Sequence, residues 1–148
     1  MTETTETLSL AETLVRLSQV VQHVFAEVSR EHGLTPQQAQ LLCRLVPGPV
    51  RMADLARMLN LEKSSVTGLV DRVENRGLVT RAQDANDRRA CQVTLTPLGI
   101  KLALHSHSNV MSRLDLLVNG LPSADTDQMA SVLASILAQY SASTGHRM

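Results

Sequence analysis

The central stretch of the chain, residues 54–99, reads DLARMLNLEKSSVTGLVDRVENRGLVTRAQDANDRRACQVTLTPLG. Two apolar patterns with helical spacing run from Met52 to Leu59 and from Glu62 to Arg76, and Asn60-Leu61 separates them. Gly77 is placed to end the second helix with a left-handed C-terminal cap. Two short helices joined by a tight turn are typical of a helix-turn-helix.

After Gly77 the apolar spacing changes to strict alternation. Residues 78–83 and 91–96 alternate as half-buried strands do, and residues 84–89 form a polar turn between them. This pattern predicts a β-hairpin with a charged tip. A helix-turn-helix followed by a hairpin is a winged helix, whose second helix fits the major groove of B-DNA while the wing can reach the neighbouring minor groove.

Longer helices flank this unit on both sides. An apolar stripe predicts an amphipathic helix over about residues 8–32, and Thr35-Pro36 with Gln38 forms a capping box that opens the next helix. Thr96-Pro97 starts a long helix, and a last one begins near Ser123. The predicted fold is mainly α with a small β-hairpin, in a single domain over residues 1–148. The winged helix-turn-helix spans about residues 36–96, between N- and C-terminal dimerisation helices at about 8–32 and 97–141.

Composition excludes several classes of protein. A chain of 148 residues with 43% hydrophobic and 19% charged residues suits one globular domain. Phe25 and Tyr140 are its only aromatic residues, which argues against base stacking on single-stranded nucleic acid. The acidic N-terminus has no apolar block typical of a signal peptide, and no window approaches the length of a membrane span. With only two cysteines, a cytoplasmic location is expected.

The formal net charge of zero conceals an uneven distribution. Residues 51–101 hold nine basic and six acidic residues, whereas residues 1–35 hold two basic and five acidic ones. A basic middle between neutral or acidic ends is typical of a protein with one face that meets polyphosphate.

The stretch resembles the winged helix of MarR-type transcriptional regulators. The shared features are the LA…L first helix, the VT…LVDRVE.RGLV recognition helix, the D..DRR wing and the LT..G exit. The resemblance covers the whole chain, because that family has two helices before the winged unit and two long ones after it. It implies a homodimer that binds double-stranded, pseudo-palindromic DNA, with the first, fifth and sixth helices forming the dimer. A small-molecule effector would then release the protein from its operator DNA or change how it binds that DNA.

The predicted DNA contacts lie on the exposed face of the recognition helix and at the wing tip. Small hydroxylated side chains let the helix approach base edges, and a lysine near its N-terminus can neutralise a phosphate. The resemblance implies that Asp87 orients the wing arginine and that Arg89 enters the minor groove. The candidates are Lys63, Ser64, Ser65, Thr67, Gly68, Arg72, Asp87, Arg88 and Arg89.

Two positions depart from the family pattern, and one candidate has a structural alternative. Gly68 stands where many relatives have a larger or basic side chain, and Arg51 stands where they often have a Ser or Thr cap. We therefore expect a weaker start to the helix that follows Arg51. Arg72 could pair with Asp71, Glu74 or Asp87 rather than contact a base.

Arg16 and His23 are the candidate ligand-binding residues. They share one face of the first helix with Glu27. The resemblance implies a ligand cavity near this helix, so we predict an aromatic or phenolic carboxylate held by Arg16, with His23 bonded to a ring hydroxyl. The alternative is a salt bridge from Arg16 to Glu27 or Asp115 across the dimer interface.

Other functions are alternatives within or outside this fold. His105 and His107 are two residues apart and point in different directions, so no metal site and no cofactor are predicted. Cys43 and Cys91 lie in apolar patterns that favour packing over thiol sensing. No enzyme is predicted, because no strained turn presents a nucleophile and no glycine loop cradles a phosphate. A winged helix used only to bind protein would not need two arginines at its tip.

Overall fold

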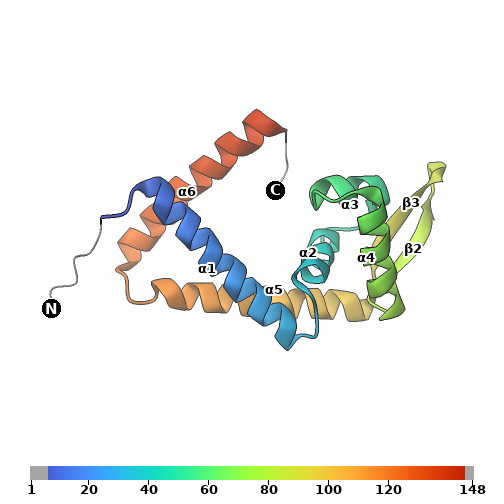
Figure 1. The fold of residues 1–148 in the computed structure, drawn as a ribbon, viewed down its shortest axis with the longest axis horizontal. Coiled ribbons are helices and arrows are strands. Elements are labelled where there is room, and N and C mark those ends of the chain that lie inside the picture. The colour runs from blue at the N-terminus through green and yellow to red at the C-terminus, as the bar shows by residue number, and fades with distance from the viewer. Residues whose placement is uncertain (1–6, 146–148) are drawn as a thin grey trace.

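The computed structural model describes residues 7–145, which form an elongated molecule with a winged end and a helical arm (Figure 1). The predicted fold, mainly helical with a small β wing, is confirmed. Its elements in chain order are α1 (Leu10–Glu31), α2 (Pro36–Leu45), β1 (Val50–Arg51), α3 (Met52–Met58), α4 (Lys63–Asn75), β2 (Val79–Asp84), β3 (Asp87–Leu95), α5 (Pro97–Val118) and α6 (Ser123–Thr144).

Local capping fixes the ends of several helices. The predicted capping box at α2 is present: Thr35 Oγ1 accepts a hydrogen bond from the Gln38 backbone, and Gln38 Oε1 accepts one from the Thr35 backbone. Thr96 Oγ1 accepts from the Gly99 backbone at the start of α5. Gly77 follows α4 with φ of 73°, the left-handed conformation predicted for it.

The wing differs from the predicted hairpin in two ways. It is a three-stranded antiparallel sheet of order β1-β3-β2, because the two-residue strand β1 pairs with β3 through Val50 and Val93. Its turn is also shorter than the predicted turn at residues 84–89. Asp87, Arg88 and Arg89 belong to β3, and a register irregularity between Gln83 and Asp84 marks the approach to the turn.

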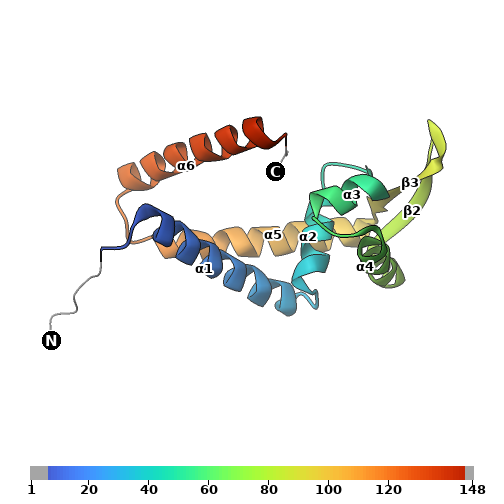
Figure 2. The same cartoon turned by 45° about the horizontal axis from the view of Figure 1, so that its top comes forward.

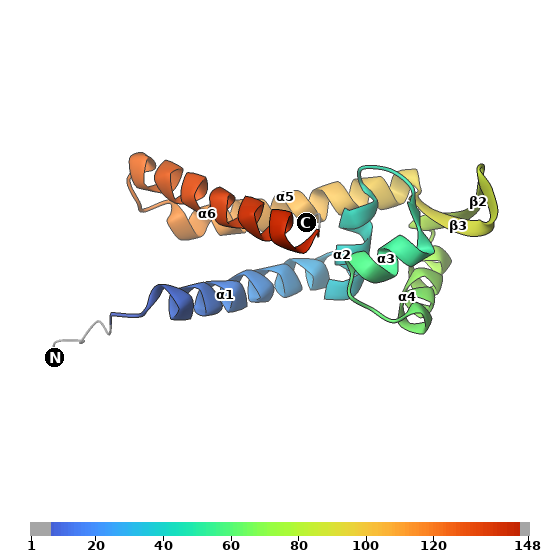
Figure 3. The same ribbon diagram turned by 90° about the horizontal axis from the view of Figure 1, so that it is seen from above.

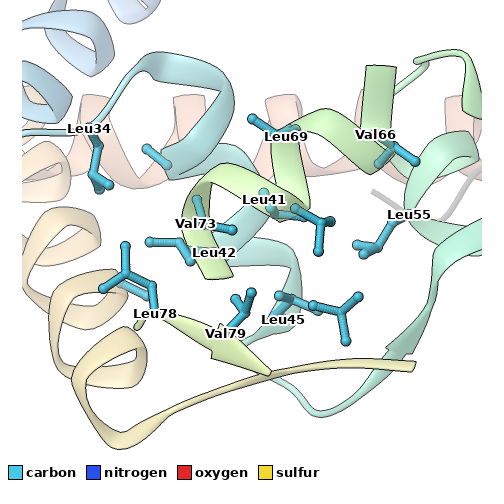
Figure 4. Close-up of a cluster of buried hydrophobic side chains, with 14 residues drawn as sticks. Leu34, Leu41, Leu42, Leu45, Leu55, Val66, Leu69, Val73, Leu78 and Val79 are labelled. Atoms are coloured by element: carbon cyan, nitrogen blue, oxygen red, sulfur yellow. The ribbon is translucent and has the colours of Figure 1, made fainter. Parts of the chain in front are cut away.

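One hydrophobic core lies at the winged end, where α2, α3, α4 and the sheet meet the start of α5 (Figure 4). Its buried residues are Leu34, Ala39, Leu41, Leu42, Leu45, Leu55, Val66, Leu69, Val70, Val73, Leu78, Val79, Val93 and Ala103. A second, smaller cluster joins α1 to α5 through Val24, Val28 and Val110.

Helix α6 contributes nothing to either core. It turns back from the end of α5 and runs apart from α1 and α5 (Figures 2 and 3), and none of its residues is buried. The helix continues to Thr144, beyond the predicted end near residue 141; residues 146–148 lie outside the described part. None of the helices in residues 7–145 has the length and apolar character needed to cross a membrane.

Candidate DNA-binding interface

Packing of α4 leaves one polar face exposed at the winged end. Val66, Leu69, Val70 and Val73 are buried in the core, so the opposite face points outward. Of the predicted contacts on this helix, Gly68 is partly buried, and the exposed ones are Lys63, Ser64, Ser65, Thr67 and Arg72.

The start of α4 is available for an anion. Glu62, its N-cap, makes no side-chain hydrogen bond to the helix. The first backbone N–H groups therefore lack a side-chain cap, which is the arrangement that suits a phosphate. Thr67 donates its hydroxyl proton to the Lys63 carbonyl at 2.8 Å, which leaves its oxygen lone pairs to accept from a base or from water.

Arg72 does not form the ion pairs considered for it from the sequence. Asp71 pairs with Arg81 of β2 instead, and within residues 7–145 no carboxylate forms a salt bridge with Arg72. Its Nη1 lies 3.6 Å from the point where a Cβ on Gly68 would stand. A Cβ at Gly68 would therefore make only ordinary contact with the Arg72 guanidinium, which lies beside Gly68.

Arg81 ties the wing to α4, and the sequence analysis did not identify it. Its Nη2 contacts the Asp71 carboxylate and donates to the Thr67 carbonyl at 3.4 Å. Its Nε is buried without a hydrogen-bond partner among the described residues. No local pattern marks this pair, because its members lie on a helix and a strand.

Arg88 and Arg89 are exposed on β3 beside the turn of the wing. Asp87 Oδ1 accepts a hydrogen bond from the Arg89 backbone N–H at 2.9 Å, and Gln83 Nε2 donates to the Arg88 carbonyl at 3.2 Å. These bonds hold the backbone of both arginines, and neither guanidinium group forms an ion pair within residues 7–145.

Arg51 fastens the wing to the start of α3. It makes no side-chain cap, in line with the expected weak helix start, and its guanidinium binds Asp84 instead. Arg51 Nε and Nη2 lie 2.8 and 2.6 Å from Asp84 Oδ2. Asp84 Oδ1 accepts from the Asn86 backbone at 3.0 Å. The Asn86 N–H, and after it the Arg51 guanidinium, lowers the pKa of the Asp84 carboxyl, which is only 6% exposed.

Arg16 and His23 both lie exposed on α1, a helix of the arm (Figure 1). Arg16 lines a shallow cavity of about 370 Å³ with Ala11, Glu12, Val15 and Gln19, and His23 is not part of that lining. His23 Nε2 lies 3.2 Å from Glu27, and Glu27 also pairs with Arg113. Within one protomer, therefore, Glu27 is engaged by groups other than Arg16.

Within residues 7–145, the cysteines and histidines show neither a reactive thiol nor a metal site. Burial raises the pKa of the Cys43 thiol, which makes it a poor nucleophile, and Cys91 is half-buried on β3. Among residues 7–145, no three His, Cys, Asp or Glu side chains lie together as metal ligands would.

Residues 32–90 match the family model for the MarR family. Over 87 residues the chain is 31% identical to the transcriptional repressor MdtR of Bacillus subtilis. Over 92 residues it is 32% identical to the homoprotocatechuate degradative operon repressor of Escherichia coli. The matches span 58% and 62% of this chain but only 56% and 62% of those relatives, less than two thirds of either length.

The similarity to solved structures extends beyond residues 32–90 to most of the chain. MarR of Escherichia coli superimposes with a TM-score of 0.79 at 22% identity, over 89% of this chain and 98% of that one. NadR in complex with 4-hydroxyphenylacetate superimposes with a TM-score of 0.69 at 26% identity, over 92% of this chain and 97% of that one. Residues 32–90 are therefore similar to the MarR family, and about nine tenths of the chain shares the winged-helix fold of these solved structures.

Proposed function

We propose that this protein is a sequence-specific transcriptional repressor that binds double-stranded DNA as a homodimer. One observation carries the proposal: α4 presents its polar face at the same end as the wing arginines. Four cations on these two elements form no ion pair within residues 7–145. The groups concerned are Lys63 and Arg72 on α4 and Arg88 and Arg89 on the wing. Unpaired surface cations around a helix of groove-binding size suit phosphate and base-edge contacts.

The two curated relatives support repression rather than catalysis, because both are named as repressors. We infer no catalytic role for this chain. Since its target would be chromosomal DNA, we place the protein in the cytoplasm.

Exposed apolar side chains on the helical arm support the homodimer. So many exposed apolar side chains on an isolated protomer are typical of an interface. Leu114 on α5 is half-buried against α1 and does not belong to these exposed side chains. The exposed residues are Leu10, Leu14, Leu17, Val21, Leu117, Met129, Val132, Leu133, Ile136, Leu137 and Tyr140. A two-fold dimer would bind a pseudo-palindrome with half-site centres about 10 bp apart.

We further propose that an aromatic or phenolic carboxylate releases the dimer from DNA. NadR, a structural neighbour, is seen in complex with such an acid, 4-hydroxyphenylacetate. Arg16 has no ion pair within the described protomer, so its planar guanidinium is available to a carboxylate. In a dimer, apolar side chains of the second copy would cover the ring.

The DNA proposal is tested by fluorescence anisotropy on a fluorescein-labelled duplex selected by the pure protein from random sequences. We expect Arg89→Ala to weaken binding by about 1–3 kcal/mol and Arg88→Ala by less, because minor-groove contacts depend on a buried guanidinium. Arg30→Ala, which removes an exposed cation from α1, is the matched control. Unchanged affinity and preference in Arg89→Ala would reject the wing assignment.

The effector proposal is tested by calorimetry with a panel of hydroxybenzoates and phenylacetates. Arg16→Ala should weaken the best acid strongly, and His23→Ala should selectively weaken acids that carry a ring hydroxyl. If Arg16→Ala binds that acid as tightly as the wild type does, Arg16 is not its carboxylate partner.

A further inference from the structure

The C-terminal end of α4 is hydrogen-bonded to the turn that follows α1 and to the residue that caps α5 (Figure 1). Helix α4 itself ends at Asn75. The contacts come from the next three residues, Arg76, Gly77 and Leu78, which we call the α4 joint. Since α1 and α5 are helices of the arm, the α4 joint connects the candidate DNA-binding helix to the arm.

Thr96 connects the α4 joint to α5. Its hydroxyl donates to the Gly77 carbonyl at 2.6 Å and accepts from the Gly99 backbone N–H at 3.1 Å. The Thr96 backbone N–H donates to the Leu78 carbonyl at 3.0 Å. One residue therefore caps the first turn of α5 and binds the chain directly after α4.

Gly99 lets α5 approach the α4 joint closely. A Cβ at Gly99 would overlap the carbonyl oxygen of Leu78, so only glycine fits at this position. The first turn of α5 thus lies directly against the backbone of the α4 joint. No side chain stands between them that could adjust by changing its rotamer.

Arg76 connects the α4 joint to the turn between α1 and α2. Its Nη1 donates to the Gly33 carbonyl at 2.7 Å and lies 3.4 Å from Gln38 Oε1. This cation lies near the C-terminal end of α1, where the helix dipole favours a positive charge. Within residues 7–145 Arg76 forms no ion pair, so its contacts are with the backbone and amide groups of this turn.

Motion between rigid elements is concentrated in the few residues at their ends. A helix bonded at one end to two other elements cannot change its angle to them unless one of those bonds breaks. We infer that the α4 joint fixes the angle between α4 and the arm, and that Arg76 and Thr96 are positioning residues that determine which half-site spacing a dimer accepts.

The arm converts this angle into a distance. Helices α1 and α5 carry exposed apolar side chains that belong to the proposed dimer interface. The angle between α4 and these helices therefore sets the separation of the two copies of α4. The effect on spacing rests on the proposed function, whereas the angle itself is a property of one protomer.

A distance measurement without DNA tests the α4 joint. Nitroxide labels at Ser64→Cys on α4 and Ser112→Cys on α5 occupy exposed positions away from the joint. The native cysteines, Cys43 and Cys91, are replaced by alanine, and an excess of unlabelled protein isolates the distance within one chain. Pulsed electron–electron double resonance then gives the distribution of that distance, which should be narrow when the joint is intact.

Removal of either bond should widen the distribution. Thr96→Val keeps the shape of the side chain but leaves the Gly77 carbonyl to water, and Arg76→Gln removes the guanidinium. Thr96→Ser retains the hydroxyl and should restore the narrow distribution. Thr80→Val and Arg30→Gln, at exposed positions outside the joint, are the matched controls.

Three results would overturn the α4 joint. The first is a broad distribution in the otherwise unchanged chain, and the second is an equal width with Thr96→Val and Arg76→Gln. The third is a Thr96→Ser distribution as broad as that of Thr96→Val. Circular dichroism on each variant verifies that its helices are intact, and the exposed Arg76 provides a second test if Thr96→Val does not fold.

The effect on spacing is measured by fluorescence anisotropy on a series of duplexes. The half-sites of the selected duplex are moved apart or together by single base pairs. The wild type can bind a wrongly spaced duplex only if the joint opens. Thr96→Val should therefore lower the preference for the best spacing by about fivefold, the factor that one hydrogen bond contributes. Thr96→Ser should retain that preference.

The ratio of affinities separates positioning from stability. A variant that only destabilises the fold would weaken binding by the same factor at every spacing, and this result would reject Thr96 as a positioning residue. If the protein bound no DNA at all, the repressor proposal would fail. The distance measurement would still decide whether the α4 joint fixes the angle of α4.

Discussion

The two ends of the molecule differ in how much apolar surface the protomer can cover by itself. At the winged end, six elements bury a continuous set of leucines and valines, several of them completely. In the helical arm only Val24, Val28 and Val110 form a buried cluster, and α6 buries nothing. The winged end therefore covers its own apolar side chains, whereas the arm leaves most of its apolar side chains exposed.

Charge separates the two ends less sharply, because both contain ion pairs. In the arm, Arg113 pairs with Glu27 and Glu31, and at the winged end Arg51 pairs with Asp84. The wing tip differs from both, since Arg88 and Arg89 have no carboxylate partner within residues 7–145. Its cations are therefore available to an anion.

The strongest test of this contrast is a substitution that creates a cavity in the core of the winged end. Leu42→Ala should lower the free energy of unfolding by about 2–5 kcal/mol, because Leu42 is fully buried and its neighbours cannot collapse into the space. Urea denaturation monitored by circular dichroism measures this loss. Gln40→Ala on the exposed side of α2 is the control. A loss below about 1 kcal/mol would mean that this core is loosely packed.

A charge on the arm should break association instead of folding. Ile136→Asp places a carboxylate in the apolar stripe of α6, so sedimentation should show a monomer of 16.1 kDa where the wild type is a dimer. The winged end should keep its urea midpoint under conditions where both proteins are monomeric. Ser131→Asp, on the opposite side of α6, should remain dimeric; a monomeric wild type would contradict the role assigned to the arm.

Removal of one phosphate contact should have a smaller and sequence-independent effect. Lys63→Ala should weaken binding to all duplexes alike and reduce the slope of log affinity against log salt by about 0.9, the value for one neutralised phosphate. A salt titration of anisotropy on two unrelated duplexes measures both quantities. An altered base preference in this variant would instead assign Lys63 to base contacts.

The smallest expected effect concerns the pH dependence of the wing. The pKa of Asp84 is lowered in the fold, so its stabilising contribution is present above the unfolded value of about 4 and is lost as pH falls through the folded value. The difference in urea midpoint between wild type and Asp84→Asn should therefore shrink between pH 7 and about pH 3. A difference that stayed constant over this range would show that the carboxylate charge is not what holds the wing.

Local signals predicted most helix boundaries correctly. The capping box of Thr35 and Gln38 and the left-handed Gly77 depend on neighbouring residues, so their sequence patterns carry the geometry. Strand β1 escaped prediction because two residues have no periodicity. The turn was predicted at residues 84–89 but is shorter, because polarity does not reveal that Asp87–Arg89 belong to strand β3.

Pairs distant in sequence could not be predicted. Arg51 was recognised only as a poor cap, and its ion pair with Asp84 joins residues 33 positions apart. Asp71 was considered only as a partner for Arg72. Its ion pair with Arg81 could not be predicted, since strand and helix meet only in the tertiary structure. The candidate DNA contacts on α4 were accessible to sequence reasoning because helical spacing alone separates its buried face from its exposed one.

The uncovered face of α6 has a consequence for abundance. If a second copy must cover it before DNA can be bound, the concentration of binding-competent protein varies with the square of the monomer concentration whenever monomers predominate. Halving the number of chains in a cell would then reduce the dimer about fourfold. Synthesis and degradation of the chain would thereby change the amount of dimer more than in proportion to the number of chains.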